Sequence, residues 1–142
     1  MKCLLDTCVV SELLKKEPNH NVASWIDSQN EDDLYLSIIT VGEFFKGISK
    51  LPDNDDRKIN LINWLENDLL TRFENKILEI DFNIIKEWGC ILGVNEKKGI
   101  VIPAIDSLIG VTAVVNDFIL VTRNVKDFRL TNCNLKNPWK FS

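Results

Sequence analysis

Short apolar runs alternate along this chain with longer stretches in which apolar residues recur every three or four positions. The runs are Cys3–Leu5, Leu34–Ser37, Ile77–Ile80 and Ile119–Val121, and each predicts a short buried strand. The stretches between them predict amphipathic helices, because residues three and four apart share one helix face. Such alternation is typical of an α/β fold in which helices cover a parallel sheet.

The apolar stripes also predict where individual helices lie. One stripe runs through Phe44, Phe45 and Ile48, and another from Ile59 to Leu69, with the polar segment Pro52–Asp56 between them. We therefore expect a helical hairpin around residues 39–70. A further stripe, Ile84–Leu92, predicts a later helix, and stripes of this kind usually face the core.

Length and composition predict one domain covering residues 1–142. The chain is 45% hydrophobic and has no apolar run long enough to span a membrane, so we expect a cytosolic protein with no membrane association. The net charge is −4, which by itself argues against a nucleic-acid partner. Residues 1–85 have a balance of −7, however, and residues 86–142 a balance of +3, which leaves contact with a phosphodiester backbone open.

Four acids occupy related positions in this pattern. Asp6 ends the first apolar run, and Glu43 comes soon after the second. Asp106 lies at the predicted start of a helix, and Asp127 follows the last run. Ligands of parallel sheets bind outside the carboxyl ends of the strands. We therefore expect the four carboxylates to meet in one pocket.

Each acid alone has a simpler explanation. Asp6 is suited to cap the helix after it, while Glu43 and Asp106 suit the first turns of their helices, where a carboxylate gains about 0.3–1 kcal/mol from the macrodipole. Asp127 suits a short turn or a weak surface pair with Arg123. The shared placement of all four favours a joint role, and crowded carboxylates repel one another unless a cation lies between them. Hard divalent ions take such oxygen ligands.

The available side chains restrict the chemistry. The single histidine, His20, lies in a polar stretch, so no Ser or Cys has an evident base to activate it. Hydrolysis by a metal-activated water remains, and a phosphodiester is the expected target of an all-carboxylate site. Thr7, Thr122 and Asn124 are suited to hydrogen-bond the carboxylates or metal-bound water, although each is also an ordinary cap or turn residue.

Several fragments resemble the PIN-domain ribonucleases, specifically the VapC toxins of bacterial toxin–antitoxin pairs. The resemblance extends over nearly the whole chain, and the order and spacing of the fragments make it specific. It rests on Leu5-Asp6-Thr7-Cys8-Val9-Val10-Ser11-Glu12-Leu13, Thr40-Val41-Gly42-Glu43-Phe44, Ala104-Ile105-Asp106-Ser107-Leu108-Ile109 and Thr122-Arg123-Asn124-Val125-Lys126-Asp127-Phe128.

This resemblance implies a three-layer α/β/α fold around a parallel sheet of about four to five strands, and Mg²⁺- or Mn²⁺-dependent endonucleolytic cleavage of RNA. Asp6 and Asp106 would be the principal metal ligands, and Glu43 would bind metal or position water. Asp127 would complete the catalytic set. Apart from the resemblance, we expect Arg123, Lys126 or Lys97 to contact the substrate backbone. The family further implies a VapB antitoxin that blocks the acidic groove, and a toxin homodimer.

The chain departs from the family pattern in two places. Cys8 stands where family members usually carry Asn after the Asp-Thr pair. Some PIN domains place an acid where Asn124 stands, which leaves open whether Asn124 or Asp127 completes the site. An alternative of another class is a receiver-like signalling domain that binds Mg²⁺ in an acidic pocket. Receivers, however, need paired acids after the first strand, whereas here Asp6 follows Leu5.

Overall fold

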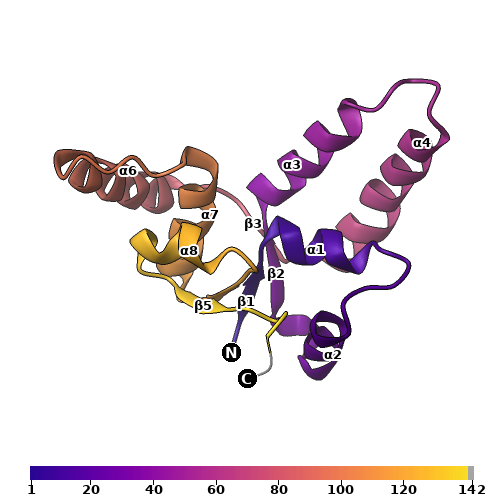
Figure 1. Cartoon of the computed structure of the whole chain (residues 1–142), viewed down its shortest axis with the longest axis horizontal. Coiled ribbons are helices and arrows are strands. Elements are labelled where there is room, and N and C mark those ends of the chain that lie inside the picture. The colour runs from indigo at the N-terminus through magenta and orange to yellow at the C-terminus, as the bar shows by residue number, and fades with distance from the viewer. Residues whose placement is uncertain (141–142) are drawn as a thin grey trace.

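The computed structural model describes residues 1–140 and contains a five-stranded parallel sheet (Figure 1). The strands lie in the order β3-β2-β1-β4-β5, so β1 is central. The predicted parallel sheet is thereby confirmed, and three of the four predicted strands have the observed bounds. The third strand is shorter than predicted, and the fifth strand was not predicted because no apolar run marks it. The strands are β1 Cys3–Leu5, β2 Leu34–Ser37, β3 Ile77–Leu78, β4 Ile119–Val121 and β5 Asn134–Lys136.

Helices connect the strands, and most begin at a polar residue whose side chain accepts a hydrogen bond from the first turn. Asn19, Ser37, Asp55 and Asp81 have this capping role for α2, α3, α4 and α6. Between α4 and α5 the chain forms a π-helix at Trp64–Leu69. The helices are α1 Thr7–Leu13, α2 His20–Ser28, α3 Ile38–Ser49, α4 Asp56–Asn63, α5 Leu70–Arg72, α6 Phe82–Lys97, α7 Ala104–Asn116 and α8 Val125–Phe128.

Two hydrophobic cores lie on opposite faces of the sheet. Alternation along β1 separates them, because Cys3 and Leu5 enter one core and Leu4 enters the other. The first core includes buried residues of α1, α2 and α3, and the second packs α7 and α8 against the sheet. Trp139, from the C-terminal segment, packs against the first core, while Phe141 lies outside the described residues. The fold is therefore the three-layer α/β/α arrangement that the family resemblance implies.

Some apolar residues of the predicted stripes do not reach a core. Ile59 on α4 is 60% exposed and Ile85 on α6 is 44% exposed, whereas Ile84 is buried. The expectation that such stripes face the core is wrong at these positions, because α4 and α6 extend away from the sheet (Figure 1). In residues 1–140, no helix is both long and apolar enough to cross a membrane.

Candidate active site

Asp6 lies at the carboxyl end of the central strand, where its backbone and side chain are both fixed. Its backbone N–H donates to the carbonyl of Val121 at 2.9 Å, which continues the pairing of β1 with β4. Its carboxylate accepts a hydrogen bond from the Thr7 N–H at 2.9 Å and so caps α1. The simple capping explanation is thus correct, and it leaves the second carboxylate oxygen for other partners.

That second oxygen, Oδ2, accepts a hydrogen bond from Thr122 at the end of the neighbouring strand β4. The Thr122 hydroxyl donates at 2.8 Å and itself accepts from the Asn124 N–H at 3.0 Å. The Cys8 thiol also lies 3.6 Å from Oδ2, and the Arg123 N–H donates to its sulfur at 3.5 Å. Cys8 therefore still contacts Asp6 from the position where the family usually carries Asn.

Glu43 is connected to Asp6 through Thr7. The Thr7 hydroxyl donates to Glu43 Oε1 at 2.8 Å and lies 3.1 Å from the hydroxyl of Thr40. Glu43 is the sixth residue of α3, which begins at Ile38. The prediction that it lies in the first helical turn is wrong because Ser37 starts the helix directly after β2. The macrodipole acts over the first turn only, so it does not account for this acid.

Asp106 and Asp127 approach the same region from the other layer. Asp106 lies in the first turn of α7, as predicted, and Asp127 lies in the short helix α8. Within residues 1–140 Asp127 forms no ion pair, so the expected surface pair with Arg123 is absent. The four acids therefore come from four separate segments that the sheet topology brings to one edge.

The carboxylates act on one another electrostatically. Burial raises the pKa of Asp106, and the charges of Asp6, Asp127 and Glu43 raise it further. Burial is also the main reason that the pKa of Asp6 is raised, while its hydrogen bonds from Thr122 and Thr7 oppose the shift and the charge of Asp127 adds to it. Asp6 is only 5% exposed, so its charge is poorly solvated.

Two open cavities flank the acids, and neither is lined by all four, so the expected single pocket is not seen in them. One, of ≈ 540 Å³, lies between α3 and α7 and is lined by Glu43, Asp106 and the aliphatic side chains around them. Lys46, one helical turn after Glu43, lines the same cavity and was not singled out from the sequence. The other, of ≈ 420 Å³, lies beside Asp127 and is lined by Arg123 and Asn124 as well.

The donor set suits a hard divalent cation. Within residues 1–140 no three His, Cys, Asp or Glu side chains are close enough to hold one ion together, so the acids form a loose group. Mg²⁺ commonly keeps several waters and is held by one or two carboxylates together with substrate phosphates. An ion held by Asp6 and Asp106 fits that arrangement and would offset the burial and the repulsion that raise both pKa values.

Comparison with known proteins places this architecture in a family. A model of the PIN domain matches residues 3–131. The chain is 35% identical over 137 residues to VapC ribonuclease Y4jK of Sinorhizobium fredii, covering 96% of this chain and 97% of the relative. It is also 35% identical over 136 residues to Toxin FitB of Neisseria gonorrhoeae, again covering 96% and 97%.

A solved structure supports the same assignment. FitAB bound to an IR36 DNA fragment contains a chain that superposes with a TM-score of 0.90 at 34% identity, covering 99% of this chain and 97% of that one. The family match includes the strand ends at Asp6 and Thr122 and the acids between them. From its sequence, its sheet topology and these similarities, the chain belongs to the PIN domain family.

Proposed function

We propose that this protein is an endoribonuclease toxin of a toxin–antitoxin pair, and that it hydrolyses RNA phosphodiester bonds with the help of Mg²⁺ or Mn²⁺. The proposal depends above all on one observation, which is that hydrogen bonds from Thr7 and Thr122 orient the carboxylate of Asp6 at the end of the central strand, while the Thr7 hydroxyl also donates to Glu43. The membership of the chain in the PIN domain family and its similarity to a VapC ribonuclease support hydrolysis of RNA as the reaction.

The acids have different proposed roles because their surroundings differ. Asp6, oriented by Thr122 and Thr7, would hold the cation together with Asp106. When bound, such an ion lowers the pKa of coordinated water and polarises the scissile phosphate. Glu43, whose Oε1 is oriented by the Thr7 hydroxyl, would orient the attacking water or accept its proton.

Three further residues would assist around this centre. Asp127, in α8, would complete the acidic set. Asn124 would contribute mainly through its backbone N–H, which orients the Thr122 hydroxyl. Arg123 lines the cavity next to Asp127 and would contact the substrate backbone. This division assigns the acidic role to Asp127 and a supporting role to Asn124.

The receiver-like alternative is not favoured. A receiver requires paired acids after its first strand, whereas Asp6 is preceded here by buried Leu5. The match to the PIN domain over residues 3–131 further supports the nuclease.

A partner and an assembly belong to the same proposal. FitB is described as a toxin, and FitAB was solved on DNA. By analogy, this chain would bind a small VapB-type antitoxin that covers the acidic groove. It would form a homodimer and act on RNA in the cytoplasm.

The proposal is tested by replacing one carboxylate oxygen. Asp6→Asn keeps the size of the side chain but removes its negative charge, so RNA cleavage should fall by at least about a hundredfold. The matched control is Glu96→Gln on the exposed surface of α6, which should cleave RNA like the parent. Cleavage of labelled RNA is followed with Mg²⁺, with Mn²⁺ and with EDTA, and circular dichroism checks the fold. Retention of parent activity by Asp6→Asn would remove Asp6 from its role.

Metal binding has a separate readout. A ligand that binds only the native state raises the melting temperature, so Mn²⁺ should raise that of the parent and of Glu96→Gln, and raise that of Asp6→Asn much less. An equal increase in all three proteins would place the ion elsewhere. RNA cleavage that persists in EDTA would contradict metal dependence but leave the nuclease proposal standing.

A further inference from the structure

A basic groove lies next to the acidic site. It is the ≈ 420 Å³ cavity whose wall is formed by the cations Arg123, Lys126 and Lys140 and the amides Asn124 and Asn137, with Asp127 at one end. Lys140 also lines an adjoining ≈ 220 Å³ cavity together with Lys136 and His20. Positive charge therefore continues from the edge of the acidic site across the C-terminal segment.

The cations of this groove are not neutralised within the described part of the chain. The ion pairs found among residues 1–140 involve other basic groups, and Arg123, Lys126 and Lys140 are all exposed. Among the residues that line this cavity the acid is Asp127, which belongs to the catalytic set. The overall charge of −4 therefore conceals a local surface suited to an anion.

Part of the groove is held in place by the C-terminal segment. The Arg123 guanidinium lies over the Trp139 ring, 5.2 Å from its centroid. Trp139 packs against the first core. Its backbone carbonyl accepts from the Asn21 side chain at 2.9 Å, and its backbone N–H donates to the side-chain oxygen of Asn137 at 3.0 Å. Because an exposed arginine stacked on a fixed aromatic ring has fewer conformations to lose, Arg123 is preorganised for binding.

The groove is also positioned to receive the substrate of the acidic site. Arg123 and Asn124 directly follow Thr122, which donates to Asp6, and the Arg123 N–H contacts Cys8 beside the same carboxylate. Asp127 both lines the groove and acts on the charge of Asp106. An RNA strand with one phosphate at Asp6 and Asp106 would therefore continue into this groove on one side.

We propose that this groove binds the phosphodiester backbone of a single-stranded RNA next to the scissile bond, through Arg123, Lys126 and Lys140. The inference rests on the proposed nuclease function and adds to it the path of the substrate. A cationic track beside the catalytic centre binds successive phosphates without reading bases. The groove thus contributes affinity for the RNA backbone and positions it beside the acids, but it does not select a base sequence.

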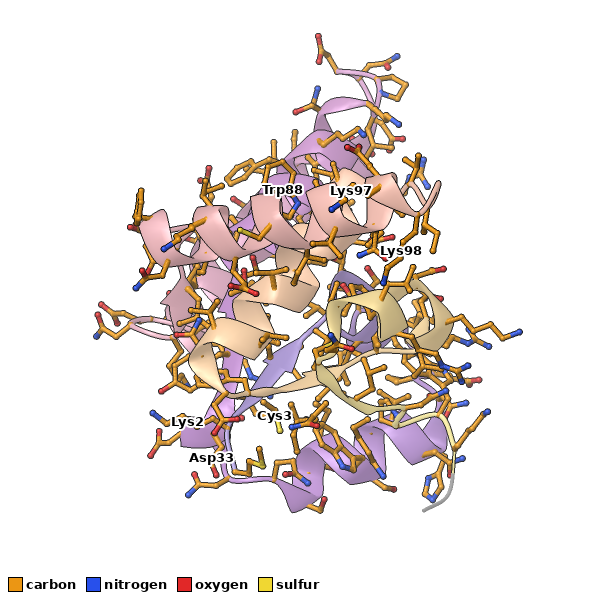
Figure 2. All side chains as sticks on the ribbon, turned by 90° about the vertical axis from the view of Figure 1, so that its left-hand side faces the viewer. Lys2, Cys3, Asp33, Trp88, Lys97 and Lys98 are labelled. Atoms are coloured by element: carbon orange, nitrogen blue, oxygen red, sulfur yellow. The ribbon has the colours of Figure 1, made fainter. Side chains whose placement is uncertain are left out.

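The experiment removes the three cations and compares the loss with a matched control. Arg123→Ala, Lys126→Ala and Lys140→Ala are combined in an Asp6→Asn background so that the RNA stays intact. The control combines Lys86→Ala, Lys97→Ala and Lys98→Ala, which removes the same charge from α6 and its C-terminal end; Figure 2 shows Lys97 and Lys98 there. Fluorescence anisotropy with a short fluorescein-labelled single-stranded RNA is measured over a series of salt concentrations.

The groove variant should bind this RNA on the order of 10- to 100-fold more weakly at low salt. Its slope of log affinity against log salt should decrease by about 2, since each phosphate contact to a single strand contributes about 0.7. The control should stay within about twofold of its parent. A double variant, Lys126→Ala with Lys140→Ala, leaves the Arg123–Trp139 contact intact and should show an intermediate loss.

The outcomes separate this inference from the proposed function. If the protein with native Asp6 cleaves RNA and the groove variant binds RNA as the control does, the groove inference is overturned and the nuclease proposal stands. If native protein neither cleaves nor binds RNA, both fail. If RNA affinity is unchanged but binding of polyglutamate is lost, the groove belongs to an acidic polypeptide and the inference is again overturned.

Discussion

At the scale of the residue, Asp6 combines two roles that seemed to compete. One oxygen caps α1 and the other accepts from Thr122. The capping role follows from sequence, because Asp is favoured where a strand turns into a helix. The bond to Thr122 joins residues 116 positions apart, so only the pairing of β1 with β4 reveals it. Sequence indicated both residues, but not that they touch.

Thr122 provides the first prediction. Thr122→Val keeps the shape but removes the hydroxyl that donates to buried Asp6. RNA cleavage should fall by about 10- to 100-fold, as is usual when a residue orienting a metal ligand is lost. Thr122→Ser restores the hydroxyl and should recover most of the activity. Full activity in the valine variant, at unchanged secondary structure, would show that this hydrogen bond is dispensable.

At the scale of the element, apolar patterning predicted the strands well and the surroundings of the helices less well. β5 was not predicted because Asn134–Lys136 is partly polar and lies at the sheet edge, where one apolar face is enough. Trp64–Leu69 was predicted within one long helical stripe, and its π-helical pairing is invisible to spacing. The start of α3 was misplaced because Ser37 both ends β2 and caps the helix.

The packing of α7 supports a second prediction. A Cβ added at Gly110 would lie 2.7 Å from Thr131 Oγ1 and 2.9 Å from its Cγ2. Thr131 is completely buried and its hydroxyl donates to the Phe128 carbonyl, so it has little room to move. Gly110→Ala should therefore destabilise the protein, because overpacking costs about 1–3 kcal/mol and outweighs the helical gain of about 0.5–1 kcal/mol.

The control for this variant is Gly93→Ala on α6. An added Cβ there meets nothing within 4 Å, so the helical gain should appear as a stabilisation of about 0.5–1 kcal/mol. Both variants are compared by urea unfolding. Equal effects of the two substitutions would mean that Thr131 yields to the added methyl group.

At the scale of the whole molecule, the edge at which the acids meet was predictable, whereas their electrostatics was not. Parallel strands bring their carboxyl ends together, and this general rule located Asp6 and Asp127 near one another. Burial of individual carboxylates, and the charges that act on Asp106, depend on how the layers pack on both faces of the sheet. Lys140 could not be singled out from the sequence. It lines the groove only because β5 pairs with β4 and so places the C-terminal segment there.

The raised pKa of Asp106 leads to a prediction about stability and pH. A carboxyl whose pKa is higher in the folded than in the unfolded chain destabilises the fold when ionised. In metal-free buffer at neutral pH, Asp106→Asn should therefore melt at a higher temperature than the parent. The difference should shrink as the pH falls through the raised pKa and vanish below the unfolded value of 3.8.

Thermal melts over this pH range check the prediction, with Glu96→Gln as the control for loss of one exposed charge. Saturating Mn²⁺ should reverse the order at neutral pH, since the parent gains binding energy that the variant lacks. A lower melting temperature of Asp106→Asn throughout, without metal, would show that this carboxylate stabilises the fold instead of straining it.

The dispersal of the acids along the chain has a consequence for when the toxin becomes dangerous. Residues 6, 43, 106 and 127 reach the same edge of the sheet only after β1 has paired with both of its neighbours and α7 has packed. While β4 and α8 are still inside the ribosome, the nascent chain has no complete active site. The cell making such a protein therefore has the interval until synthesis is almost finished in which to supply the molecule that restrains it.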